Sequence, residues 1–367
     1  MSENIKTGHE RRTALPINEQ SIPLKFDELL SAAFVGTASG QQGEYADLKG
    51  IMGSILREVT QNPEREEKYK DFLKNVFKLK NLWQLAGLPN VEHRFRACVL
   101  IYFQQRLFDD IMDGDTPEKL VPAERVAYAR VRLEHLRTGN FDGSDPIDAF
   151  TIRILGDISS LDTSYVPKAR QRLEQIMNSI TFDGERICAT ETPGTWKFSS
   201  SDELQRHFFN LDTEGVIGLT LFLFGFQDSE NNMKLLTPLA QATRIAYNVR
   251  DFAADVRAGL CNIPAEDAEV FRITDADLRK VVAARHTAEF PQNITDWLLG
   301  QVVEGQKLLG LHASQPTAKM EPIIKPRRVM QSMRLSPYRK FVASKVLKTA
   351  YVDVAQKVFR DATRELR

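Results

Sequence analysis

One stretch constrains this chain more than any other: residues 96–115, RACVLIYFQQRLFDDIMDGD, begin as an apolar helix and end in acid. Apolar side chains fall on every side of the first half, which predicts a helix in the interior rather than on the surface. Asp109, Asp110 and Asp113 stand at its C-terminal end. Asp109 and Asp113 share one face, where like charges four residues apart destabilise a helix and the helix dipole adds to the penalty.

This concentration of negative charge predicts a bound cation. Two carboxylates about 5 Å apart repel by roughly 3 kcal/mol at an effective dielectric constant of about 20. Hard divalent ions such as Mg²⁺ bind carboxylate oxygens and leave positions open for water and phosphate. The alternative interpretation is an acidic helix end in water, without a ligand.

A second acidic pair lies on another long helical stretch, residues 239–264. Asp251 and Asp255 are four residues apart, with Arg250 and Arg257 beside them. Alone, they would suit a surface face of ion pairs. Two such pairs on separate helices predict a cavity with carboxylates on opposing walls, as in metal sites of helical bundles. Departure of a diphosphate suits this chemistry, because Mg²⁺ neutralises the leaving group and dry aromatic walls shelter a carbocation.

Together the two stretches resemble the motifs of the squalene/phytoene synthase family of class I isoprenoid synthases. The first motif is matched by Arg96, Ala97, Tyr102, Arg106, Asp109, Asp110 and Asp113. The second is matched by Arg250, Asp251, Asp255, Gly259 and Pro264. The similarity runs from about residue 79 to residue 277. It implies a single large α-helical bundle with a central pocket over residues 24–367, after a flexible N-terminal tail of residues 1–23.

Periodicity along the chain also predicts an all-α protein, because helical patterns recur and no period-two strand series appears. The stretch Phe182–Ser200 reads as irregular and holds the only candidate for a short strand. Asp145 before Pro146 predicts a helix start, and Thr274 with Asp277 predicts a capping box. The expected helices are Leu48–Thr60, Glu64–Leu85, Pro122–Arg137, Pro146–Ser160, Tyr165–Ile180, Asp202–Phe226, Asn232–Cys261, Thr274–Ala288, Asn293–Leu311 and Pro337–Arg364.

Between the motifs the sequence departs from the family pattern. Where the family has a Tyr-x-x-Tyr-Val-Ala-Gly-like run, this chain has residues 209–215, FNLDTEG, so Asp212 replaces a phenol and Glu214 a small residue. A buried carboxylate is unfavourable unless it is paired. One interpretation pairs these acids with Arg244 or Arg206 as a structural bridge. The other makes one of them a base or hydrogen-bond acceptor for a substrate N–H or O–H group.

The resemblance assigns roles to individual residues. The predicted Mg²⁺ ligands are Asp109, Asp110, Asp113, Asp251 and Asp255, and the predicted catalytic residues are Arg106, Asp212 and Glu214. The predicted substrate-binding residues are Arg96, Tyr102, Phe103, Phe209, Arg244, Tyr247, Asn248, Arg250 and Arg257. For the aromatic members, plain core packing is the alternative.

The retained first motif and the altered second half favour one function. We expect a Mg²⁺-dependent prenyltransferase that ionises an allylic prenyl diphosphate and transfers the prenyl group to a carbon of a non-prenyl, aromatic, carbazole-like acceptor. The alternatives are head-to-head coupling of two farnesyl or geranylgeranyl diphosphates, cyclisation of one prenyl diphosphate, and a non-catalytic role in complex assembly.

Charge and composition limit the partners. Zero net charge favours neither nucleic acid nor an anionic membrane. The longest apolar run, residues 216–226, is about half the length of a membrane-spanning helix. Three scattered cysteines and a polar N-terminus predict a cytoplasmic, reducing location. The expected partners are a prenyl diphosphate and a small-molecule acceptor, and the expected state is a monomer or homodimer.

Overall fold

A computed structural model describes residues 63–85, 87–115, 120–189, 194–314 and 348–366, together with Phe26 and Gly53. The predictions for the N-terminal tail, for most of Leu48–Thr60 and for the first part of Pro337–Arg364 lie outside these residues. Within them the regular secondary structure is helical and no strand occurs, so the all-α prediction is confirmed.

The described helices follow one another closely. The α-helices are α3 (Pro63–Leu85), α4 (Val91–Asp113), α5 (Pro122–Thr138), α6 (Pro146–Leu161), α7 (Val166–Cys188), α8 (Ser201–Phe208), α9 (Gly218–Leu223), α10 (Glu230–Ala258), α11 (Ala265–Val270), α12 (Asp275–Ala283), α13 (Gln292–Ser314) and α15 (Asp353–Leu366). Two short 3₁₀ turns are η1 (Thr163–Tyr165) and η3 (Thr287–Glu289), and two π-helical segments are η2 (Phe209–Ile217) and η6 (Lys348–Val352).

Local sequence signals explain where several helices begin. The Asp145 carboxylate accepts hydrogen bonds from the backbone N–H groups of Ile147 and Asp148 at 2.9 and 3.2 Å, which caps α6 as predicted. Thr274 and Asp277 form the predicted capping box of α12. That helix ends at Ala283, earlier than the predicted Ala288, because the backbone turns extended at the next residue.

Both helices with acidic pairs end in the same way, within one turn of the second acid. Gly114 follows α4 at φ 78° and Gly259 follows α10 at φ 91°, a left-handed conformation that glycine adopts without strain. The N–H of Asp115 donates to the carbonyl of Asp110 at 2.9 Å, and the N–H of Leu260 donates to the carbonyl of Asp255 at 2.8 Å. These caps fix the acidic residues in the last turns of both helices.

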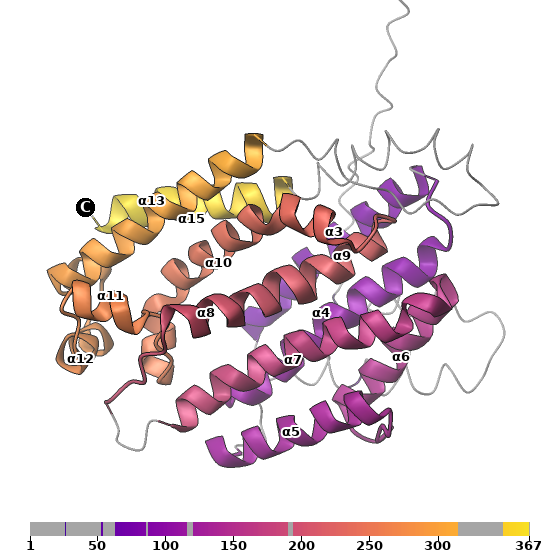
Figure 1. Cartoon of the computed structure of the whole chain (residues 1–367), viewed down its shortest axis with the longest axis horizontal. Coiled ribbons are helices and arrows are strands. Elements are labelled where there is room, and N and C mark those ends of the chain that lie inside the picture. The colour runs from indigo at the N-terminus through magenta and orange to yellow at the C-terminus, as the bar shows by residue number, and fades with distance from the viewer. Residues whose placement is uncertain are drawn as a thin grey trace, which may run out of the picture.

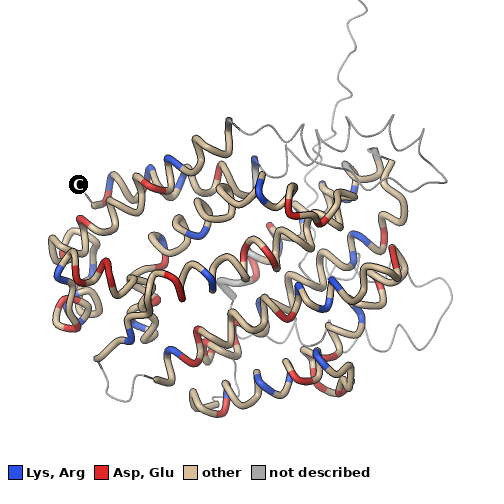
Figure 2. Tube along the Cα trace, viewed as in Figure 1, with Lys and Arg blue, Asp and Glu red and all other residues tan. Residues whose placement is uncertain are grey.

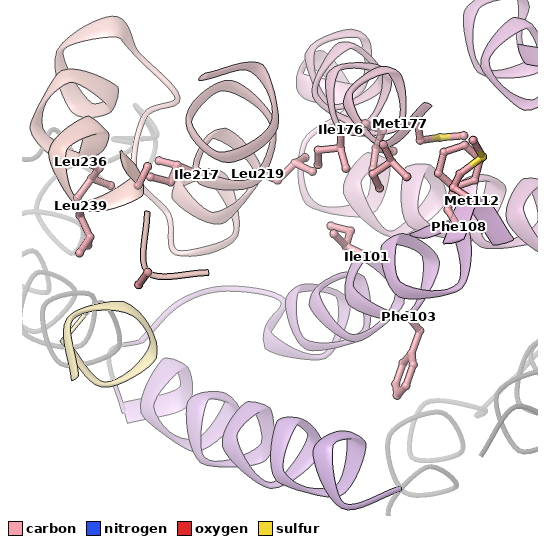
Figure 3. Close-up of a cluster of buried hydrophobic side chains, with 14 of the residues drawn as sticks. Ile101, Phe103, Phe108, Met112, Ile176, Met177, Ile217, Leu219, Leu236 and Leu239 are labelled. Carbon is pink, nitrogen blue, oxygen red and sulfur yellow. The ribbon is translucent and has the colours of Figure 1, made fainter. Parts of the chain in front are cut away.

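The helices pack in an ordered series across the molecule (Figure 1). α10 contacts α13 and α15 on one side and η2 on the other, and η2 in turn contacts α7. α7 lies against α4 and α5, and α4 also packs on α3 and α6. Buried apolar side chains link these layers from α10 through η2 and α9 to α7 and α4 (Figure 3): Leu236, Leu239, Ile217, Leu219, Ile176, Met177, Ile101, Phe108 and Met112.

Two predictions about residues 182–226 are wrong. Residues 182–188 are not irregular, because α7 continues through them to Cys188. Gly184 allows this helix to pass close to α4, since a Cβ atom there would lie 2.1 Å from Cε of Met112. The predicted single helix Asp202–Phe226 is instead divided by the π-helical η2. Residues 195–200, which precede α8, form no strand.

The apolar run of residues 216–226 belongs to the core, where Leu219, Leu221 and Phe222 are buried. No helix among the described residues is long and apolar enough to cross a membrane. Lys and Arg alternate with Asp and Glu along the helices (Figure 2), in keeping with the zero net charge.

Candidate functional site

Arg106 organises the acidic end of α4. Its Nη1 donates to Oδ2 of Asp109 at 2.9 Å, and its Nη2 lies 3.0 Å from Oδ1 of Asp110. Burial acts to lower the pKa of Arg106, but the charges of Asp109 and Asp110 outweigh it and the pKa is raised. Asp110 is fully buried. This geometry supports a role for Asp110 in holding Arg106 rather than in direct contact with a metal ion.

Asp113 faces water at the end of α4 but is surrounded by acid. Although its side chain reaches solvent, partial desolvation by the nearby protein raises its pKa. The negative charges of Asp109, Asp115 and Asp183 raise it further, to about 8, against the weaker opposing effect of Arg106. Asp113 has no ion pair with any described residue, so negative charge is left without full compensation here.

In the second acidic pair too, an arginine pairs with one carboxylate while the pKa of the other is raised. Arg250 donates to Asp251 through Nε at 2.8 Å and through Nη2 at 2.5 Å. Asp255 is half-buried, and burial followed by the charges of Asp251, Asp183 and Asp109 raises its pKa to about 7. Because Asp109 lies on α4 and Asp255 on α10, the two acidic pairs are within electrostatic range of each other.

A third acidic residue, Asp183 on α7, is within electrostatic range of both pairs and was not predicted from the sequence. It acts on both Asp113 and Asp255. Burial tends to raise its pKa, but its neighbours His207, Arg186 and Arg244 lower it overall. Asp183 was not identified as a site residue because residues 182–200 were predicted to be irregular. Continuing the helical period through Phe182 would have placed Asp183 on the face of α7 near the acidic ends.

Asp212 and Arg244 form the ion pair that was one of the two predicted interpretations. Arg244 donates to both carboxylate oxygens, at 2.8 Å each, across the contact of η2 with α10. Its guanidinium also lies over the ring of Phe208, 5.2 Å from the centroid. Phe208, rather than the predicted Phe209, is thus the aromatic residue at this point. The predicted role of Asp212 as a base stays a prediction.

Glu214 points to a different partner from the two that were predicted. It forms an ion pair with Arg172 on α7, not with Arg244 or Arg206. Arg172 also donates to both oxygens of the buried Asp228, at 3.0 and 2.9 Å. Glu214 therefore belongs to a buried network joining η2, α7 and the loop before α10, which supports a structural role.

Two predicted diphosphate-binding arginines lie in structural contacts. Arg96 is buried, and its Nε donates to Oδ2 of Asp157 on α6 at 2.7 Å. It precedes Asp109 by thirteen residues of continuous helix, about 20 Å along the axis. Arg257 donates to the carbonyl of Ala284 at 2.9 Å, just beyond the end of α12. The structure does not bring either arginine into contact with the acidic residues.

The predicted aromatic walls divide into different environments. Phe103 is 2% exposed and packs edge-on against Tyr69, with the ring centroids 5.1 Å apart, so the core-packing alternative holds for it. Figure 3 shows it pointing away from Ile101. Tyr102 stacks on an aromatic ring of α3, and Phe209 is 41% exposed.

The predicted polar residues of α10 flank the second acidic pair. The guanidinium of Arg250 lies 4.8 Å from the ring centroid of Tyr247. Tyr247 and Asn248 are both half-buried, one turn before Asp251. Tyr247 therefore places an aromatic ring beside the arginine of the second acidic pair.

The residues present fit a magnesium ion in donor chemistry and in charge. Carboxylate oxygens are the ligands that Mg²⁺ prefers, and the raised pKa values of Asp113 and Asp255 mark negative charge that a cation would offset. The fit is incomplete in geometry, because no three His, Cys, Asp or Glu side chains of the described residues lie close enough together to hold a metal. Metal binding would therefore require side-chain rearrangement.

Neither models of protein families nor curated proteins match this chain. The similarity to squalene and phytoene synthases is thus carried by the two motifs and their spacing.

Proposed function

We propose that this chain is a Mg²⁺-dependent prenyltransferase that joins an allylic prenyl group to a carbon of a non-prenyl aromatic acceptor and releases diphosphate. The observation that carries the proposal is the effect of the Asp109 charge on α4 on the pKa of Asp255 on α10. The proposal is supported by the electrostatic effects that link two acidic pairs far apart in sequence, with a third carboxylate, Asp183, acting on both Asp113 and Asp255. A chain without a cationic ligand would gain stability from separating these charges.

In this proposal Asp109, Asp113 and Asp255 would hold Mg²⁺, which would supply positive charge to offset the negative charge of the departing diphosphate. Arg106 pairs with Asp109, and Arg250 pairs with Asp251, one turn before Asp255. They add positive charge for the diphosphate oxygens, which guanidinium groups bind with two parallel hydrogen bonds.

The transfer itself breaks one bond and forms another. The bond between the prenyl carbon and the diphosphate oxygen breaks, and that carbon bonds to a carbon of the acceptor ring. The proton displaced from the ring carbon is taken by Asp212, whose orientation is fixed by Arg244. A carboxylate has about four lone-pair sites, so the two bonds from Arg244 leave acceptor capacity on Asp212.

Diphosphate release with and without an acceptor tests the proposal. The protein is incubated with Mg²⁺ and farnesyl or geranylgeranyl diphosphate, alone and with carbazole. Release that depends on carbazole, with a prenylated carbazole as product, is the expected result. A squalene-type or phytoene-type hydrocarbon formed from the prenyl diphosphate alone would overturn it in favour of head-to-head coupling, and a cyclic hydrocarbon would indicate a cyclase.

Two variants decide whether the acidic pairs carry that activity. Asp109→Asn and Asp255→Asn are each expected to abolish diphosphate release. Glu304→Gln, at an exposed carboxylate on α13, is the control and is expected to leave it unchanged. Full activity in both aspartate variants would contradict the assignment of the site.

A further inference from the structure

Arg186 is a buried arginine of α7 that belongs to neither motif. Its Nη1 donates to the carbonyl oxygen of Cys261 at 3.0 Å. Its Nη2 donates to Oδ1 of Asp183 at 2.9 Å and to Oδ1 of Asn262 at 2.6 Å. Cys261 and Asn262 lie in the loop after α10, so one guanidinium joins α7 to the segment that follows the second acidic pair.

Asn262 extends this contact to Asp255. Its Nδ2 lies 3.4 Å from Oδ2 of Asp255. The oxygen of the Asn262 amide faces Arg186, which can only donate, so the amide nitrogen is directed at the carboxylate. The orientation of Asp255 therefore depends on Arg186 through a single intervening side chain.

Arg186 holds Asp183 with the same nitrogen atom. Oδ1 of Asp183 accepts from Nη2 of Arg186 and lies 3.2 Å from Nε2 of His207. Both neighbours thus contact the same oxygen, and the other oxygen has no hydrogen bond to a described residue. Arg186 therefore fixes two carboxylates from two helices relative to one another.

A contribution to the stability of the fold does not explain well why a buried arginine occupies this position. Arg186 is 3% exposed, and its Nε is buried without a hydrogen-bond partner among the described residues. A buried donor left unsatisfied is destabilising, and a buried ion pair often contributes no net stability relative to an apolar replacement. Its arrangement suits orientation of the acids better than it suits stabilisation of the fold.

We infer that Arg186 is a positioning residue of the proposed magnesium site, which sets the placement of Asp183 directly and of Asp255 through Asn262. This inference rests on the proposed function. Groups that orient metal-binding side chains typically change metal affinity by about 10- to 100-fold when removed. Arginine is suited to the task because its planar fork serves three acceptors at once, which the single ammonium of lysine cannot reproduce.

A magnesium titration followed by thermal unfolding tests the inference. The EDTA-treated protein is unfolded by heat at increasing MgCl₂ concentrations, for the wild type, Asn262→Ala and Arg186→Lys. A ligand that binds the folded state raises the midpoint as its concentration passes the dissociation constant. We expect the Mg²⁺ dissociation constant to rise about tenfold in both variants, while Asn262→Ala unfolds near the wild-type temperature without metal.

Turnover provides a second readout that a purely structural role would not change. In both variants the Mg²⁺ concentration for half-maximal diphosphate release is expected to rise about tenfold, with kcat recovered at saturating Mg²⁺. Arg132→Lys is the matched control. Arg132 is also a buried arginine between two carboxylates, with Nη1 3.0 Å from Asp145 and 3.3 Å from Asp148, in the contact of α5 with α6.

The outcomes separate the inference from the proposed function. Wild-type Mg²⁺ affinity in both variants, or an equal loss in Arg132→Lys, would overturn the positioning role and leave the proposed function standing. A wild-type protein that binds no Mg²⁺ and releases no diphosphate would overturn both. If Arg186→Lys fails to fold, Asn262→Ala decides, since Asn262 lies half-buried in a loop.

Discussion

Replacing Asp255 by asparagine is expected to stabilise the metal-free protein above neutral pH. Burial, followed by the charges of Asp251, Asp183 and Asp109, raises the pKa of the Asp255 carboxyl from 3.8 to about 7. The unfolded chain therefore releases this proton near pH 3.8, whereas the folded chain keeps it to about pH 7. Because the folded state binds more protons within this window, stability falls as the pH rises through it.

The size of the effect follows from the two pKa values. A change from 3.8 to about 7 corresponds to about 4 kcal/mol of unfavourable free energy for the ionised carboxylate of Asp255. The side chain keeps partial contact with water, which screens its charge, so we expect about 2 kcal/mol in practice. Asparagine carries no ionisable proton. The stability difference between variant and wild type is thus near zero below both pKa values and largest above both.

Urea denaturation in EDTA, at a series of pH values from about 4 to about 9, measures this difference. The variant is expected to be the more stable protein at the alkaline end, and excess Mg²⁺ is expected to stabilise only the wild type. Asp296→Asn, at an exposed aspartate of α13, is the control for removing a carboxylate. The reasoning is refuted if Asp255→Asn is no more stable than the wild type at about pH 9 in EDTA.

Three further substitutions test other parts of the structure. Arg96→Met removes the arginine partner of the buried Asp157 carboxylate and leaves it only His93, whose Nδ1 lies 2.9 Å away, so we expect a loss of about 3 kcal/mol of stability in urea denaturation without a change in Mg²⁺ affinity. Gly184→Ala places a Cβ atom against Met112 and is expected to destabilise by about 1 to 3 kcal/mol; a double-mutant cycle with Met112→Ala should show positive coupling. Asp212→Asn is expected to slow prenyl transfer while binding of inorganic diphosphate is unchanged; unchanged turnover would leave Asp212 a structural residue.

Features that depend on residues close together in sequence were predictable. The two acidic pairs were found from four-residue spacing alone, and the structure places both in the last turns of their helices. The starts of α6 and α12 followed from Asp145 and Thr274, because capping is a matter of three or four residues. The class I isoprenoid synthase fold and its central pocket stay predictions.

Partners brought together by packing were not predictable. Arg244 and Arg206 were predicted as partners of both Asp212 and Glu214, but Glu214 pairs with Arg172. The reason is that Asp212 and Glu214 are two residues apart, and side chains at this spacing on a helix do not face each other. As η2 packs between α7 and α10, Asp212 meets Arg244 on α10 and Glu214 meets Arg172 on α7.

Arginines beside the two acidic pairs neutralise some of the carboxylates but form no ion pair with others. Arg106 and Arg250 pair with neighbouring aspartates, whereas Asp113 and Asp255 have no ion pair with a described residue. In the metal-free protein, bound protons neutralise these two carboxylates, since the pKa values of Asp113 and Asp255 are about 8 and about 7. A metal ion must displace those protons, because only the ionised carboxylate binds it well.

Magnesium binding is therefore expected to release about one proton near neutral pH and to weaken as the pH falls below 7. Calorimetric titrations with MgCl₂ in two buffers of different ionisation enthalpy measure the number of protons released. The Asp255→Asn variant, which has no carboxyl to deprotonate at that position, should release fewer. Binding without proton release at neutral pH would mean that Asp113 and Asp255 are not the groups that receive the metal, and the cation would then have to bind the already ionised carboxylates beside Arg106 and Arg250.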